Sequence, residues 1–188
     1  GIATLARKYV EAVQGTGARI YDTRKTTPGW RRMEKYAVRL GGGHNHRSGL
    51  FDAMLIKDNH LALAAESQGS DRLTPGEAVR RAREFAENMA ATQAAAPMII
   101  EVEVDTLELL EQVLGEQPDL VLLDNMSPDQ LKRAVALRDR LAPGVELEAS
   151  GGVTLENVAA IAKSGVERIS VGALTHSAVS LDVGMDWL

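Results

Sequence analysis

The alternation that decides the fold is clearest in residues 119–152, DLVLLDNMSPDQLKRAVALRDRLAPGVELEASGG. Residues 119–123 form a short apolar run, which predicts a strand buried on both faces of a sheet. The sequence SPDQ at 127–130 predicts a capping box with proline at the first helical position, and therefore a helix over 128–141. A second short strand is predicted at 145–149. Two strands joined by a helix indicate a parallel β-α-β unit.

The same alternation extends over the whole chain. Strands are predicted at 18–22, 52–56, 98–104, 119–123, 145–149 and 167–171. Helices are predicted at 3–15, 30–40, 77–95, 106–114, 128–141 and 154–164, followed by a C-terminal helical tail. Six strands alternating with helices predict an α/β protein with a parallel sheet.

The choice between a doubly wound sheet and a barrel depends on the residues directly after each strand. No strand is followed by a G-x-G-x-x-G turn, so the dinucleotide-binding fingerprint is missing. Polar residues and glycines come after nearly every strand instead, as in TIM barrels, whose carboxyl-end loops build one site. Eight strands are usual in such a barrel. We therefore expect an incomplete, open TIM-like β/α barrel of about six parallel strands.

Composition limits the class of protein. The chain has 188 residues, of which 45% are hydrophobic and 25% charged, and it has no cysteine. These values predict a single globular domain over 1–188, without a disulfide framework, a thiolate zinc site or a cysteine nucleophile. No apolar run is long enough to span a membrane, and no signal peptide opens the chain. We expect a cytoplasmic location and no membrane partner. Because the first residue is not methionine, we also expect a longer parent protein.

The charge is distributed unevenly. The formal net charge is −5, yet residues 19–57 carry nine Lys or Arg against three acids. A basic segment in an acidic chain predicts a small anionic ligand rather than nucleic acid, which would need a broadly basic face. Arg31, Arg32, Lys35 and Arg39 recur at helical spacing, so we interpret these four as a solvent-exposed helix face.

Three polar motifs predict where the anion binds. Residues 23–29, TRKTTPG, leave the first strand with two cations. Arg24 can bind a carboxylate through two parallel hydrogen bonds, and Lys25 supplies a compact point charge. The segments GGGHNHR at 41–47 and IKDNH at 56–60 add donors and a lysine at a strand end. Together the motifs predict a site for a multiply charged anion.

The last two strands are followed by glycines. Ser150-Gly151-Gly152 and Gly172-Ala173 each precede a predicted helix. Such a pair of loops is typical of the barrel phosphate site, in which free backbone N–H groups at a helix start point at the anion. The alternative is that these glycines only form tight turns.

Carboxylates on neighbouring strands suggest a metal or sugar site. Glu101 and Glu103 alternate on one strand and so face one side, and Asp124 ends the next strand. Such a pair could hold Mg²⁺ or accept hydrogen bonds from sugar hydroxyls, but its spacing does not predict a glycosidase. His44 and His46 could instead ligate the metal of an amidohydrolase-like barrel, an alternative that their cationic neighbours disfavour.

Seven motifs carry a resemblance to a known family. In order, they are TRKTTPG at 23–29, GGGHNHR at 41–47, IKDNH at 56–60, EVEVD at 101–105, LDN at 123–125, SGG at 150–152 and VGALTH at 171–176. Over about residues 1–182 the chain resembles the quinolinate phosphoribosyltransferases, the carboxylating nicotinate-nucleotide pyrophosphorylases. The resemblance implies a Mg²⁺-dependent pentosyltransferase of de novo NAD biosynthesis. It would convert quinolinate and phosphoribosyl pyrophosphate into nicotinate mononucleotide, pyrophosphate and CO₂.

The resemblance also implies roles for individual residues. The residues implied to bind quinolinate are Thr23, Arg24, Lys25, His46, Arg47 and Lys57. Those implied to bind phosphoribosyl pyrophosphate are Lys25, Lys57, Glu103, Asp124, Ser150, Gly151, Gly152, Gly172, Ala173, Leu174 and His176. The implied catalytic residues are Lys25, Lys57, Glu103 and Asp124, and the last two would hold Mg²⁺, either directly or through water.

In the family an N-terminal domain precedes the barrel and supplies an arginine to the neighbouring subunit of a dimer. That domain is absent from this chain, so the resemblance implies a homodimer or larger homo-oligomer whose site a neighbour completes. Two rival functions remain open at this point. One is the molybdenum-transport-associated paralogue of the family, against which the full set of cations argues. The other is a catalytically incomplete barrel fragment that acts only in binding or assembly.

Overall fold

The computed structural model describes residues 1–188 except 69–72, 94–97, 181 and 188. The strands are β1 (Arg19–Tyr21), β2 (Met54–Ile56), β3 (Ile100–Val104), β4 (Leu120–Asp124), β5 (Glu146–Ser150) and β6 (Arg168–Ser170). The helices are α1 (Ile2–Ala12), α2 (Arg31–Leu40), α3 (Asp58–Gln68), α4 (Pro75–Gln93), α5 (Leu107–Leu114), α6 (Pro128–Leu141), α7 (Val158–Ala162) and α8 (Ala173–His176).

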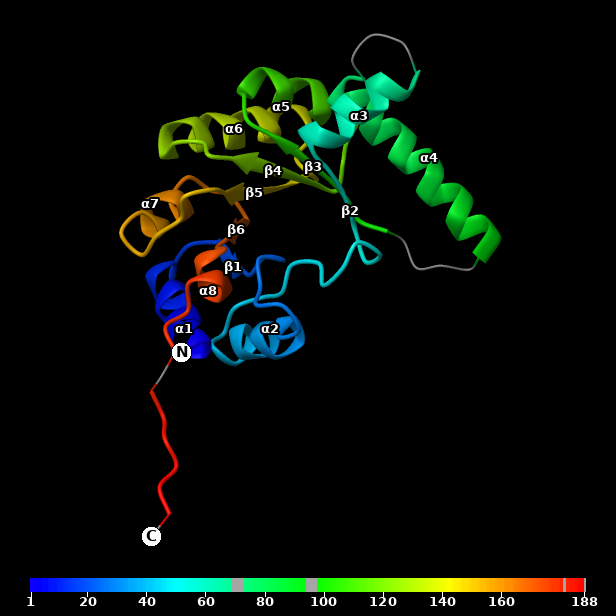
Figure 1. Cartoon of the computed structure of the whole chain (residues 1–188). Coiled ribbons are helices and arrows are strands. Elements are labelled where there is room, and N and C mark those ends of the chain that lie inside the picture. Colours follow the sequence, from blue (N-terminus) through cyan, green and yellow to red (C-terminus); the bar gives the residue numbers. More distant parts are fainter. Residues whose placement is uncertain (69–72, 94–97, 181, 188) are drawn as a thin grey trace.

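All six strands belong to one parallel sheet in the order β1-β6-β5-β4-β3-β2. The two edge strands, β1 and β2, do not pair with each other, so the barrel is open, as predicted. The segment between α2 and β2 runs between these edges (Figure 1) and adds one bridge, from His44 to Tyr21. Because every strand runs the same way, the loops after the strands meet at one edge of the sheet.

The sheet is buried by helices on its outer face. Helices α4, α5, α6 and α7 pack in sequence beside one another, and α1 packs against α2, α7 and α8 (Figure 1). The apolar residues 120–123 of β4 are all buried, as predicted for a strand covered on both faces. None of the described helices is long and apolar enough to cross a bilayer.

Local signals explain where several helices begin. The Ser127 hydroxyl accepts a hydrogen bond from the Gln130 N–H while the Gln130 side chain accepts one from the Ser127 N–H, which confirms the capping box of α6. In α5, the Thr106 hydroxyl accepts from the Leu109 N–H at 3.2 Å. Helix α2 ends at Gly41, the first of the three glycines.

Several predicted elements differ from the observed ones. Helix α3 was not expected, because it begins at Asp58 and Asn59, polar residues just after β2 that are equally typical of a loop. Helix α4 begins at Pro75, and the predicted end at residue 95 lies outside the described residues. The expected C-terminal helical tail is wrong: α8 has four residues, and the described residues after it form no helix.

Candidate active site

Two segments far apart in sequence are tied together beside the last strand. The Thr175 hydroxyl in α8 donates to the carbonyl oxygen of Lys25, in the loop after β1, at 2.7 Å. A Cβ atom on Gly172 would lie 3.0 Å from the His176 ring and 3.5 Å from Cδ of Lys25. The structure therefore brings Lys25, Gly172 and His176 together, and a side chain at position 172 would require the His176 ring to shift.

The loop after β5 is shaped by its neighbour after β4. Gly151 has a φ of +90°, and a Cβ atom there would lie 2.1 Å from the Asn125 side-chain oxygen. The Asn157 side chain accepts from the Thr154 N–H and donates to the Gly152 carbonyl, both at 2.9 Å. The loop is thus a fixed backbone turn of the kind that can receive phosphate.

The helix after this loop is shorter than expected. The predicted helix over 154–164 is α7, which begins only at Val158, after a turn in which the N–H groups of Asn157 and Val158 bond to the Thr154 carbonyl. Any anion beside Gly152 would therefore meet turn N–H groups rather than a regular helix start. The reason is local, because the Asn157 side chain closes the turn before the helix can extend backward.

Glu103 and Asp124 line one cavity of about 530 Å³. They lie on the adjacent strands β3 and β4, and the cavity also contacts Asp58 and Asp105. Lys57, at the end of β2, forms an ion pair with Glu103. Carboxylate oxygens on two neighbouring strands, open to a cavity, are the ligand type that Mg²⁺ prefers, so these residues fit the ion that the family resemblance implies.

Arg24 and Arg47 are two cations from different loops whose charges interact. Burial and the charge of Arg24 lower the pKa of Arg47, while Glu101 and Asp52 oppose this shift. Among the described residues, the buried Nε of Arg24 has no hydrogen-bond partner. Arg47 uses one donor on the Ala53 carbonyl, at 3.2 Å. Two guanidinium groups, one of which has an unpaired N–H donor, can bind an anion that carries several carboxylates.

A buried ion pair holds the loop that carries Arg47. Lys35 of α2 pairs with Asp22, the residue after β1, and the two side chains are 5% and 0% exposed. The same carboxylate accepts from the Asn45 side chain at 2.6 Å and from the His46 N–H at 2.9 Å. Lys35 also donates to the His46 carbonyl at 3.0 Å. The backbone of His46 is therefore held on both sides.

This contact corrects the sequence interpretation of α2. Lys35 is buried rather than solvent-exposed, because a carboxylate thirteen residues earlier in the chain neutralises it. Arg31 is half-buried and donates to the Thr26 hydroxyl and to the carbonyls of Arg24 and Ser48. The expected exposure holds for Arg32 and Arg39.

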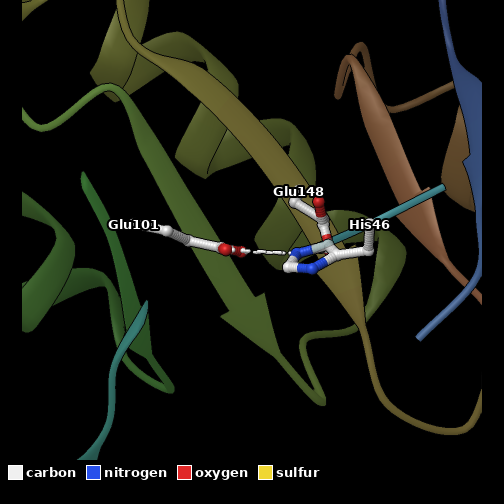
Figure 2. A group of neighbouring side chains, drawn as sticks. All are labelled: His46, Glu101 and Glu148. Carbon is white, nitrogen blue, oxygen red and sulfur yellow. Dashed lines mark hydrogen bonds and ion pairs between the residues drawn. The ribbon is translucent and has the colours of Figure 1, made fainter. Parts of the chain in front are cut away.

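The His46 side chain points into the barrel, where it meets two buried glutamates (Figure 2). Its Nε2 lies 3.1 Å from an oxygen of Glu101 and 3.4 Å from an oxygen of Glu148. Its Nδ1 accepts from the Arg47 N–H at 2.9 Å. These three side chains form the carboxylate–histidine cluster, in which His46 is 10%, Glu101 1% and Glu148 0% exposed.

The two histidines of the GGGHNHR motif point to different places. The His44 ring stacks on Tyr21, with the ring centroids 5.2 Å apart, whereas His46 turns toward Glu101. Burial, together with the charges of Arg19 and Arg168, lowers the pKa of His44. The His44-x-His46 metal pair of the amidohydrolase alternative is therefore wrong for this structure.

A second cavity, of about 290 Å³, contacts His46, Arg47 and Glu101. It also contacts Leu120 and Arg168, the first residues of β4 and β6, so it extends toward the amino ends of the strands. The predicted residues are thus divided between this cavity and the one lined by the Glu103 and Asp124 carboxylates. The site assignments made from sequence stay predictions.

Sequence reasoning missed several residues that shape the site, chiefly Asp22, Lys35, Glu148 and Arg168. A signal was present for Glu148, since a glutamate in the middle of a strand that a parallel sheet buries on both faces must either find a partner or lose its charge. No comparable signal exists for Asp22 and Lys35, because only the folded chain brings α2 to the end of β1.

The chain belongs to a family of phosphoribosyl-transferring barrels. Residues 2–186 match the family model described as "Quinolinate phosphoribosyl transferase, C-terminal domain". This match confirms the resemblance that the seven motifs predicted.

Individual relatives support the same family assignment. The chain is 51% identical over 187 residues to the Mycobacterium leprae protein named nicotinate-nucleotide pyrophosphorylase [carboxylating], covering 99% of this chain and 60% of the relative. It is 36% identical over 187 residues to the human protein of that name, covering 98% and 58%. The solved nicotinate-nucleotide pyrophosphorylase from Francisella tularensis superposes with a TM-score of 0.78 at 40% identity, covering 94% of this chain and 56% of the other. The chain thus spans about three fifths of the length of the relatives it matches.

Proposed function

We propose that the chain is the barrel part of an enzyme that transfers a phosphoribosyl group from phosphoribosyl pyrophosphate to quinolinate, with decarboxylation. The products would be nicotinate mononucleotide, pyrophosphate and CO₂. The observation that supports this most directly is the interaction between the charges of Arg24 and Arg47, whose repulsion a dicarboxylate would relieve, together with the buried Arg24 Nε, which has no hydrogen-bond partner among the described residues. The names of the relatives point to the same reaction.

The arginines would bind and orient quinolinate so that its ring nitrogen faces C1 of the ribose, which supplies the proximity contribution to catalysis. Lys25 and Lys57 would stabilise charge on the departing pyrophosphate. As the nitrogen bonds to C1, the bond from C1 to pyrophosphate breaks. The positively charged ring then accepts the electron pair of the adjacent carboxylate's C–C bond, CO₂ leaves, and the ring carbon takes up a proton from solvent. The role of His46 toward quinolinate stays a prediction, since both ring nitrogens already have partners in the protein.

Glu103 and Asp124 would hold the ribose hydroxyls and Mg²⁺, directly or through water. When bound, Mg²⁺ would neutralise part of the pyrophosphate charge. The loops at Gly151 and Gly172 would receive phosphate through their backbone N–H groups. The same proposal includes a homo-oligomer in which a neighbouring subunit's N-terminal domain completes the site, and a cytoplasmic location.

The test is turnover of quinolinate. The chain alone, and the chain joined to its family's N-terminal domain, would be incubated with quinolinate, phosphoribosyl pyrophosphate and Mg²⁺, while CO₂ and nicotinate mononucleotide are measured. We expect Arg24→Ala to raise the KM for quinolinate about 10- to 100-fold, because charge-assisted hydrogen bonds are lost. Arg32→Ala, which removes an exposed cation from α2, is the matched control and should leave the KM unchanged.

Absence of turnover in both forms would refute the proposed enzymatic function. Binding of phosphoribosyl pyrophosphate without turnover in either form would favour a barrel that acts only in binding or assembly. Turnover only in the joined form would support the proposed site shared between subunits.

A further inference from the structure

The hydrogen bonds of the carboxylate–histidine cluster leave one group unsatisfied. Because Nδ1 of His46 accepts from the Arg47 N–H, its ring proton must be on Nε2. Nε2 then donates to Glu101, at 3.1 to 3.2 Å. One N–H cannot serve two carboxylates equally, and among the described residues neither oxygen of Glu148 has a hydrogen-bond partner.

The charges of the cluster are also unbalanced if both glutamates are ionised. The one cation that faces Glu148, among the residues that the structure describes, is Arg168, whose Nε lies 3.6 Å from a Glu148 oxygen. With a neutral imidazole, the two carboxylates and the Arg168 guanidinium leave a net negative charge in a cluster that is almost wholly buried. Arg47, whose charge acts on Glu101, is only half-buried and lies outside the cluster, so it offsets Glu101 rather than Glu148. An uncompensated buried charge is costly, so the cluster must take up one positive charge.

A proton balances the charge better than a metal ion does. The spacing of His46, Glu101 and Glu148 would admit a divalent cation, since one ligand atom from each lies within 4.8 Å of the others. A divalent ion beside Arg168, however, would leave the buried group with a net positive charge. A proton on Nδ1 of His46 would break its bond with Arg47. Only a proton on a carboxyl group leaves the charge neutral and every observed hydrogen bond intact.

The geometry points to Glu148 as a positioning residue that works as a neutral carboxylic acid: its proton bridges the two glutamates, and Glu101 then holds the Nε2–H of His46. The effect reaches Arg47 through the ring, because Nδ1 of His46 receives the Arg47 N–H. This inference rests on the proposed function, in which Arg47 binds quinolinate. Glu148 contacts no substrate and acts only through this chain of hydrogen bonds.

The pKa of Glu148 agrees with this assignment. Burial, together with the smaller effect of the Glu101 charge, raises it to about 7, against the opposing charges of His46 and Arg168. Burial acts to lower the pKa of His46, but its hydrogen bond to Glu101 and both carboxylate charges raise that pKa above its ordinary value, so His46 competes with Glu148 for the same proton. The bond from the Arg47 N–H to Nδ1 favours Glu148 in this competition. The cluster therefore holds one proton near neutral pH and releases it as the pH rises.

Infrared spectroscopy tests the proton without any need for activity. The chain near pH 6 should show the carbonyl band of a buried, neutral carboxylic acid, which shifts in D₂O and fades as the pH rises through about 7. Glu148→Gln should abolish that band. The matched control is Glu111→Gln, which removes an exposed carboxylate from α5 and should leave the band in place.

Kinetics of the chain joined to its N-terminal domain test the positioning. Glu148→Ala should raise the KM for quinolinate about tenfold with a smaller change in kcat, because the buried Glu101 loses a partner. In the unchanged chain the KM for quinolinate should rise above about pH 7, where Glu148 loses its proton. Glu148→Gln, which imitates the neutral acid, should keep a KM near that of the unchanged chain at lower pH and should not show this rise. If Glu148→Ala fails to fold, the dependence of KM on pH in Glu148→Gln is sufficient to test the positioning role of Glu148.

Three results would overturn the inference: no acid band in the unchanged chain, a Glu148→Gln variant as impaired as Glu148→Ala, or a stoichiometric metal ion bound by Glu148 and released in Glu148→Gln. Absence of turnover in every variant, with the acid band present, would refute the proposed function and leave the proton assignment standing.

Discussion

Two buried ionic groups in this barrel, one centred on Arg138 and one on Glu148, differ in how completely their hydrogen bonds are satisfied. Arg138, near the end of α6, donates to the Val145 carbonyl at 2.6 Å and to both oxygens of Glu167, at 2.8 and 3.0 Å. Glu167 also accepts from the Leu147 N–H at 2.8 Å. This group joins α6 to the amino ends of β5 and β6, and its members satisfy one another.

The group around Glu148 is the opposite case. Among the described residues, both Glu148 oxygens, the Nε of Arg168 and the hydroxyl of Ser170 have no hydrogen-bond partner. The difference teaches that a saturated ion pair serves stability, whereas unsatisfied buried polar groups gather where a ligand or a shared proton is expected.

The sharpest way to separate function from stability is Lys57→Ala. We expect kcat to fall by about 10²- to 10³-fold, because the change removes a cation from the pyrophosphate site. The free energy of unfolding should change little, since the Lys57 side chain is 39% exposed. Near-normal product formation would refute the catalytic role of Lys57, and urea unfolding supplies the stability measurement.

The converse change is Arg138→Met, which keeps the apolar stem and removes the guanidinium. We expect a loss of about 3 kcal/mol in the free energy of unfolding, because Glu167 and the Val145 carbonyl lose their buried donor. Activity per folded molecule should be unchanged. Lys132→Met, an exposed cation on the same helix, is the control for loss of charge. An unchanged free energy of unfolding in Arg138→Met would contradict the view that the Arg138 group serves stability.

The smallest expected effect is a pH dependence of stability. Because the folded chain raises the pKa of Glu148 to about 7, protonation of Glu148 favours the folded state. This contribution is complete below the unfolded pKa of about 4.5 and is lost as the pH rises through about 7. Urea unfolding at several pH values should show a decline in the free energy of unfolding as the pH rises through about 7, and this decline should be absent from Glu148→Gln. If the free energy of unfolding depended on pH in the same way in the unchanged chain and in Glu148→Gln, the raised pKa would not belong to Glu148.

Much of the fold could be predicted, because its signals are local. The apolar run of β4 and the capping box of α6 specify a strand and a helix within a few residues, and the alternation of such units predicts a parallel sheet. Helix α3 could not be predicted in this way, since its first residues, Asp58 and Asn59, are as typical of a loop after a strand as of a helix start. Nor could the short α7, whose beginning depends on the side chain of Asn157.

Less of the site could be predicted. Charge and motif located Arg24 and Arg47, but the helical spacing that marked Lys35 as exposed carries no information about its distant partner, Asp22. The buried Glu148 was overlooked for a similar reason, because its neighbours come from a loop and from two other strands.

The sequence by itself therefore determined the parallel β/α architecture and the family, because these depend on local pattern and on residue type. The kind of anion that its basic segment receives stays a prediction. Only the tertiary structure decided which charges are buried and which of them balance. That outcome depends on contacts between residues such as His46, Glu101, Glu148 and Arg168, which lie 20 or more residues apart in the chain. The free energy of a buried charge depends on those neighbours and not on its position in the sequence.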